Sequence, residues 1–122
     1  MYSDCVPKGK FKVTNYFYLV EANSTYINLF NNNEQSVKLV EISDNIKIVN
    51  INLAAKAKVL SDINGEIIKL PSQVRPSKNL VFTAYVNREP AFAYYTNGGV
   101  TLVYNKAINT NSEIDIIANY VI

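Results

Sequence analysis

Apolar and polar residues alternate along most of this chain, a pattern typical of strands with one buried face. Between residues 49 and 59 the apolar side chains fall on odd positions, beginning at Val49. Ile46 and Ile48 lie in the opposite register, which predicts a β-bulge near Ile48 and Val49. At the end of the chain the even positions from Ile114 to Ile122 are apolar, and Glu113, Asp115 and Asn119 lie on the opposite face. This pattern predicts a final strand that runs into the last residue.

Further runs rich in β-branched and aromatic residues are predicted as strands. They cover residues 11–20, 25–30, 37–42, 66–70, 80–86, 91–96 and 100–104. Asn64-Gly65 and Asn97-Gly98 each predict a tight hairpin, because both residues of each pair tolerate a positive φ. Polar segments at residues 31–33, 44–45 and 109–112 are predicted to be loops.

Eight or nine short strands with tight turns predict an all-β fold, an antiparallel β-sandwich with the character of a jelly roll. No segment carries the 3.6-residue apolar stripe of an amphipathic helix. Residues 1–22 are expected to form an N-terminal arm or strand that serves as an attachment segment. Residues 23–122 are expected to form the β-sandwich head domain.

The composition of the chain excludes some classes of binding partner. The 122 residues, 48% hydrophobic and 18% charged, suffice for one domain with its own core. The net charge is only +2 and the basic residues are scattered, so no nucleic acid partner is expected. No apolar run reaches 18 residues, so no membrane insertion is expected. The first residues lack the apolar core of a secretory signal, which predicts synthesis in the cytoplasm.

The residues needed for common catalytic and metal chemistry are scarce. The chain has no histidine, so a Ser-His-Asp or Cys-His arrangement is excluded and zinc lacks its usual ligands. Cys5 is the single cysteine and is expected to be an inert thiol. The carboxylates are expected on solvated strand faces and loops. We therefore expect no enzymatic activity, no cofactor and no metal.

One short segment is more specific than the rest of the sequence. It reads Leu-Pro-Ser-Gln-Val-Arg-Pro-Ser from Leu70 to Ser77, just before the apolar run Leu80–Val86. Its two prolines fix φ and donate no backbone hydrogen bond, so they interrupt the sheet ladder. The arginine can bind a carbonyl or a carboxylate and hold the loop. The pattern predicts a rigid crossover with structural roles for Leu70, Pro71, Arg75, Pro76 and Ser77.

This segment and the strand order around it resemble the C-terminal, receptor-binding head domain of bacteriophage tail-fibre and baseplate proteins. In that family a segment close to Leu-Pro-x-x-Tyr-Arg-Pro-Ser precedes a strand and then an Asn-Gly turn, and here Val74 replaces the tyrosine. The resemblance covers residues 37–122. It implies a homotrimeric, jelly-roll-like head in the virion, made in the host cytoplasm, that attaches to the host surface. The chain departs from the family in lacking tryptophan and a shaft before the head, which leaves tail and capsid locations open.

Aromatic residues gather between the crossover and the second predicted hairpin. We expect Phe82, Phe92 and Tyr94 in the core or at a subunit interface. By strand alternation, Tyr85 and Tyr95 then lie on the opposite faces of their strands, beside the polar loop at residues 87–90. Tyrosine offers a flat face for a sugar ring and a hydroxyl for hydrogen bonds. The sequence therefore predicts that Tyr85, Arg88 and Tyr95 border a saccharide-binding patch.

Two other functions fit the same residues. The protein could be a structural virion component, such as a head fibre or a capsid decoration protein, that recognises no host. It would then bind other virion proteins through its N-terminal segment. It could also be a small carbohydrate-binding β-sandwich module, although such modules outside cells usually carry a secretory signal.

Overall fold

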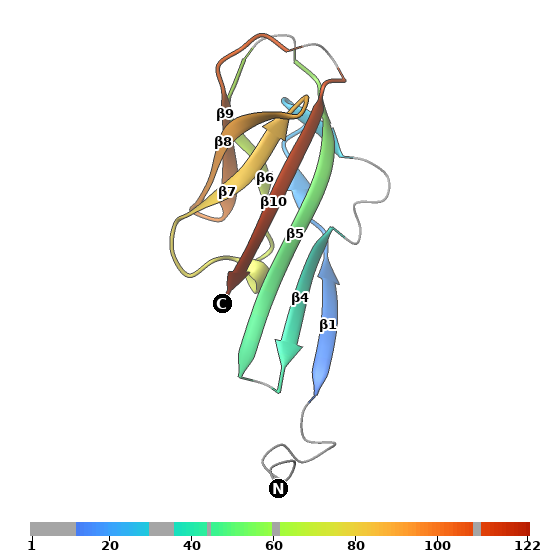
Figure 1. Ribbon diagram of the computed structural model, residues 1–122, viewed down its shortest axis with the longest axis vertical. Helices are drawn as coiled ribbons and strands as arrows, with labels where there is room; N and C mark the ends of the chain where they lie inside the picture. Colours follow the sequence, from blue (N-terminus) through green and yellow to red (C-terminus); the bar gives the residue numbers. More distant parts are fainter. Residues whose placement is uncertain (1–11, 30–35, 44, 60–61, 109–110) are drawn as a thin grey trace, which may run out of the picture.

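The computed structural model describes residues 12–29, 36–43, 45–59, 62–108 and 111–122. These residues form ten antiparallel strands and one 3-10 turn, so the all-β prediction is confirmed with more strands than expected (Figure 1). The elements are β1 (Val13–Tyr18), β2 (Glu21–Ala22), β3 (Ile27–Leu29), β4 (Val37–Ile42), β5 (Ile46–Ala57), β6 (Ile63–Lys69), η3 (Ser72–Val74), β7 (Leu80–Val86), β8 (Glu89–Thr96), β9 (Gly99–Tyr104) and β10 (Glu113–Val121). Within the described part of the chain, no helix is long and apolar enough to cross a membrane.

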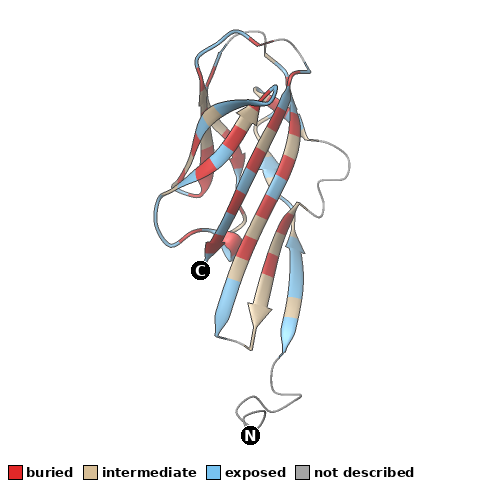
Figure 2. Ribbon diagram, in the orientation of Figure 1, coloured by how far each residue is buried: buried red, intermediate tan, exposed pale blue. Residues whose placement is uncertain are grey.

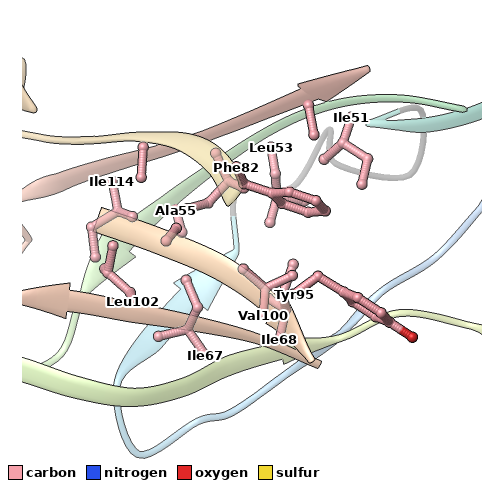
Figure 3. Close-up of a cluster of buried hydrophobic side chains, with 14 of the residues drawn as sticks. Ile51, Leu53, Ala55, Ile67, Ile68, Phe82, Tyr95, Val100, Leu102 and Ile114 are labelled. Atoms are coloured by element: carbon pink, nitrogen blue, oxygen red, sulfur yellow. The ribbon is translucent and has the colours of Figure 1, made fainter. Parts of the chain in front are cut away.

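The strands build a single sheet that curls over a core. Their order is β1-β4-β5-β10-β7-β8-β9-β6-β2, with β3 beside β5. Side chains from β5 and β10, such as Leu53 and Ile114, meet side chains from β6 and β9, such as Ile67 and Leu102 (Figure 3). β2 pairs with β6 while β3 pairs with β5, so the short stretch between them ties the two halves together. The fold is sandwich-like, but its two layers belong to one sheet.

The long strands β5 and β10 show the alternation that the sequence predicts. From Val49 onward in β5, and throughout β10, inward residues are buried and outward residues are exposed or half-buried, which appears as banding along both strands (Figure 2). The bulge predicted near Ile48 and Val49 is wrong, because β5 keeps an unbroken register with both β4 and β10. Ile46 and Ile48 point outward instead, and Ile46 is 47% exposed.

The break in register occurs in β6. Between Glu66 and Ile68 the pairing with β9 shifts by one residue. A bulge adds one residue to a strand, so two neighbouring side chains can turn to the same face. Ile67 and Ile68 are accordingly both fully buried.

The hairpin predicted at Asn64-Gly65 is also wrong, since both residues lie within β6 opposite β9. The glycine is needed for close packing. A Cβ on Gly65 would lie 2.6 Å from the phenol oxygen of Tyr26 and 2.9 Å from its ring. Only glycine lets the Tyr26 ring approach the strand so closely, which is a common role for glycine inside a strand.

Two tight hairpins join the strands β7, β8 and β9. Asn97-Gly98 connects β8 to β9 with both residues at positive φ, as the sequence predicts. Asn87 and Arg88 also have positive φ and join β7 to β8, so residues 87–90 are a two-residue turn followed by the start of β8. The loop predicted at residues 87–90 is therefore confirmed only for Asn87 and Arg88, and it is shorter than expected because arginine is an unusual residue at positive φ.

The Leu-Pro-x-x-x-Arg-Pro-Ser segment crosses from β6 to β7 through η3. Arg75 Nε donates a hydrogen bond of 2.8 Å to the carbonyl oxygen of Leu70, a contact of the kind expected for a pinned loop. The Arg75 guanidinium also lies against Gly98, where a Cβ would come within 3.0 Å of its central carbon. Tyr120 Oη donates to the carbonyl oxygen of Val74. Burial raises the pKa of the Tyr120 phenol, so the hydroxyl keeps the proton that it donates.

Part of the predicted N-terminal arm belongs to the sheet. β1 pairs with β4 along its whole length, and β2 pairs with the end of β6. Residues 1–11, including Cys5, lie outside the described residues, as does the predicted loop at 31–33. The attachment role of residues 1–22 stays a prediction.

Candidate functional site

The three residues predicted to border the saccharide-binding patch are not all exposed on the surface. Tyr95 is only 6% exposed and points into the core, where it lies opposite Leu80 and Val100. Its phenol oxygen accepts a hydrogen bond of 3.2 Å from the backbone N–H of Gly98. The expectation that Tyr95 is exposed is therefore wrong, and its hydroxyl supports the β8–β9 hairpin.

The other two predicted residues lie near the surface at the β7–β8 hairpin. Tyr85 is half-buried on β7, on the outer side of the sheet, between Asp115 of β10 and Pro90 of β8. Arg88 is exposed at the second position of the turn. Their role in binding stays a prediction.

The strand β8 has the opposite orientation to the one predicted. Ala93 and Tyr95 are buried, whereas Phe92 is 49% exposed and Tyr94 is half-buried on the outer side. Among the three residues expected in the core or at a subunit interface, only Phe82 is buried in the core, and an interface role for Phe92 and Tyr94 stays a prediction. The inward-facing residues of neighbouring strands explain this orientation of β8, because the small Ala93 lies directly between the large Phe82 and Leu102. A phenylalanine in that place would overfill a close-packed layer.

The outer side of β7 and β8 consequently carries an aromatic surface. We define the aromatic surface as Val81, Thr83, Tyr85, Phe92 and Tyr94. The Phe92 and Tyr94 rings lie 5.4 Å apart between centroids and are tilted by 38°. Val81 lies opposite Tyr94, and Thr83 lies opposite Phe92, so the five side chains are direct or diagonal neighbours.

A shallow groove of about 200 Å³ borders the aromatic surface, between β7 and β10. The two strands are paired only as far as Thr83 and Ile117, whereas β10 stays paired with β5 as far as Val121. Beyond Thr83 the gap between the strands is lined by residues 80–83 and 117–120. On the core side the stacked rings of Phe82 and Tyr120, 5.8 Å apart, lie across the gap.

The groove combines apolar rims with a few polar groups. Val81 is 70% exposed and Ile117 is 37% exposed at its edges. The Thr83 hydroxyl and the Asn119 amide also belong to exposed residues that line it. The groove therefore offers both apolar area and hydrogen-bonding groups, but it is smaller and more open than a usual small-molecule pocket. Exposed aromatic side chains beside it make the same face a candidate binding surface.

An ion pair with a tyrosine lies at the start of β8. Tyr104 Oη donates to Glu89 Oε1 at 2.5 Å, and Lys106 Nζ lies 3.3 Å from the same oxygen. The Tyr104 hydrogen bond and then Lys106 lower the pKa of Glu89, and the same hydrogen bond raises the pKa of Tyr104. This cluster joins the start of β8 to the end of β9 and to Lys106 just after it, next to the turn that carries Arg88.

Tyr104→Phe is expected to raise the pKa of Glu89 toward its ordinary value, because the largest stabiliser of the carboxylate is lost. A lowered folded-state pKa gives stability that is present above the unfolded-state pKa and is lost as pH falls through the folded-state value. The Tyr104→Phe protein should therefore lose less stability than the wild type on acidification. NMR titration of the Glu89 carboxyl measures the change directly. Tyr94→Phe is the matched control, and an equal pKa in all three proteins would contradict the account.

The described residues contain no group of three or more His, Cys, Asp or Glu side chains placed to hold a metal ion. Comparisons with protein-family models, curated proteins and solved structures find no match to this chain. Function is therefore inferred from the residues of the chain themselves. The aromatic surface and the adjoining groove are the candidate site.

Proposed function

We propose that this protein is a non-enzymatic bacteriophage virion protein, of the tail-fibre or baseplate type, that attaches to a saccharide on the host surface. We further propose that the saccharide lies on the aromatic surface and reaches into the groove between β7 and β10. The observation that carries the binding part of this proposal is the outward-facing pair of Phe92 and Tyr94 next to that groove.

The chemistry of a sugar ring suits this surface. One face of a pyranose presents C–H groups that pack on an aromatic ring, and its edge presents hydroxyls. Phe92 and Tyr94 offer the ring faces, while Thr83 and Asn119 offer donors and acceptors at the groove. A shallow, open site of this kind gives weak individual contacts, and several copies on one virion multiply them.

The virion part of the proposal is supported by the crossover segment. Leu70, Pro71, Arg75, Pro76 and Ser77 match the phage head-domain pattern position by position. In this chain the segment is held by hydrogen bonds from Arg75 and Tyr120 and leads directly into β7, the strand that carries part of the aromatic surface. The homotrimer implied by the resemblance stays a prediction.

Binding to intact bacterial cells tests the proposed function. We expect the purified protein to be retained by cells of at least one strain in a broad panel and to be lost when surface polysaccharide is stripped. The circular dichroism spectrum of the unbound protein provides the folding control. A folded protein retained by no strain would contradict attachment and favour a structural virion component.

The proposed attachment of the N-terminal segment to other virion proteins has a separate test. Because β1 begins at Val13, deletion of residues 1–11 removes no residue of the strands that the structure describes. We expect the truncated protein to keep its cell binding but to be missing from assembled virions. Normal incorporation of the truncated protein would contradict an anchoring role for this segment.

A further inference from the structure

The strand β1 is one open edge of the sheet. β1 pairs with β4 on one side, and no other described strand lies on its second side. Its sequence, Val-Thr-Asn-Tyr-Phe-Tyr, contains no charge and no proline, and its register with β4 is unbroken. Sheet proteins normally protect an edge with charge, proline or a bulge, because an unprotected edge pairs with another strand. Within the described part of the chain this edge has none of these protections.

Large apolar side chains are exposed on both faces of β1. Val13 is 57% exposed and Phe17 is 50% exposed on the outer side, and Tyr16 is 41% exposed on the inner side. On the outer side, the apolar area continues from β1 across β4 to β5, because Val13 lies opposite Ile42, which in turn lies opposite Ile46. An exposed apolar patch at a free strand edge marks an interaction surface.

The two edges of the sheet are unequal, which restricts how copies can join. The opposite edge, β2, is only two residues long and includes Glu21. Pairing of β1 with β2 of a second copy would therefore leave most of β1 unpaired. Pairing of β1 with β1 of a second copy uses the full strand and closes after two copies, because a two-fold interface is self-complementary.

A two-fold axis perpendicular to the sheet also fixes which residues can meet. Directly opposed residues in an antiparallel pair lie on the same face. With Asn15 on the axis, Val13 lies opposite Phe17 of the second copy on the outer side. Thr14 lies opposite Tyr16 on the inner side. The two Asn15 amides then face each other and can exchange hydrogen bonds, and no like charges are opposed.

We propose that β1 pairs antiparallel with β1 of a second copy of this chain, with Asn15 at the two-fold axis. The pairing joins two curled sheets into one and covers the exposed Val13 and Phe17. A single short strand pair is smaller than the interface of an obligate dimer, so the dimer is weak and reversible. This inference goes beyond the proposed function, since it assigns a partner to a different part of the surface.

Charge exchange at Asn15 tests the pairing. Asn15 is exposed and lies opposite Val40 within the monomer, so a charged residue there has space and meets no directly opposed charge. Asn15→Lys and Asn15→Asp each place like charges face to face across the axis, which destabilises a strand pair. An equimolar mixture of the two variants places opposite charges there. Asn15→Gln, which keeps the amide, is the matched control.

Sedimentation velocity over a range of about 5 to 500 μM, where weak dimers are populated, provides the readout. For wild type and Asn15→Gln we expect the mass to rise from 13.7 kDa toward twice that value. Each charged variant alone should stay monomeric with an unchanged circular dichroism spectrum, and their mixture should regain the dimer. A wild type that stays monomeric, or charged variants that associate like the wild type, would overturn the proposal. A wild type that forms trimers would also overturn it, and would agree instead with the homotrimer that the resemblance implies. Because cell binding uses a different surface, its failure would leave this result unchanged.

Discussion

Replacing Leu102 with alanine is expected to lower the free energy of unfolding by about 2–5 kcal/mol, the usual cost of deleting a buried leucine side chain. Leu102 is fully buried in β9, at the centre of the core between the two halves of the sheet (Figure 3). Its direct cross-strand neighbours are Gly65 and Ala93, which have little or no side chain to move into a cavity. The cost should therefore fall in the upper part of that range.

Urea denaturation measures this prediction, provided that the slope with denaturant stays the same in both proteins. Val81→Ala is the control, because Val81 is 70% exposed and its removal should change the free energy by no more than about 0.5 kcal/mol. Equal costs for the two substitutions would contradict the placement of the core between β5 and β9.

The double variant Phe92→Ala and Tyr94→Ala is expected to weaken saccharide binding at least about tenfold, which corresponds to about 1.4 kcal/mol. Both rings are on the outer side of β8, so their removal takes away the stacking faces and leaves the core untouched. Calorimetry with a soluble oligosaccharide in solution gives the affinity of one site without any multivalent contribution.

Phe17→Ala is the matched control for that measurement. Phe17 is 50% exposed and Phe92 is 49% exposed, so the two side chains offer similar aromatic area on different strands. The control should keep the wild-type affinity for the soluble oligosaccharide. If Phe17→Ala weakened binding as much as the double variant does, then binding would depend on any exposed aromatic side chain and not on the aromatic surface.

The sequence predicts strands well where one face is strictly apolar. The alternation of β5 and β10 is confirmed because only one of their faces meets the core, and β4 and β7 have the predicted bounds. Asn64-Gly65 fails as a hairpin because the local preference of the dipeptide is overridden by the close approach of the Tyr26 ring. A contact between residues 39 positions apart leaves no local signal in the sequence.

The candidate site was predicted only in part, for a related reason. In β8 large and small apolar residues occupy both faces, so hydrophobicity alone does not tell which face is inward. The answer depends on the neighbours across the sheet, since Ala93 is placed between Phe82 and Leu102. Once the strand pairing is known, the sizes of neighbouring side chains in the inner row can be compared. That comparison could have placed Phe92 and Tyr94 on the surface.

The pairing proposed through β1 leaves the proposed saccharide site free. A two-fold axis perpendicular to the paired β1 strands leaves the outer side of the sheet on the same side in both copies. The aromatic surface of each copy belongs to that outer side. A dimer joined through β1 would therefore present two weak saccharide sites together, and two linked sites bind a repetitive polysaccharide more tightly than one.

The most direct test of the central claim is a microarray of bacterial surface glycans probed with the purified, folded protein. We expect binding to at least one class of saccharide, and loss of that binding in the double variant Phe92→Ala and Tyr94→Ala. A folded wild-type protein that binds no glycan on the array, or a double variant that binds as well as the wild type, would contradict it.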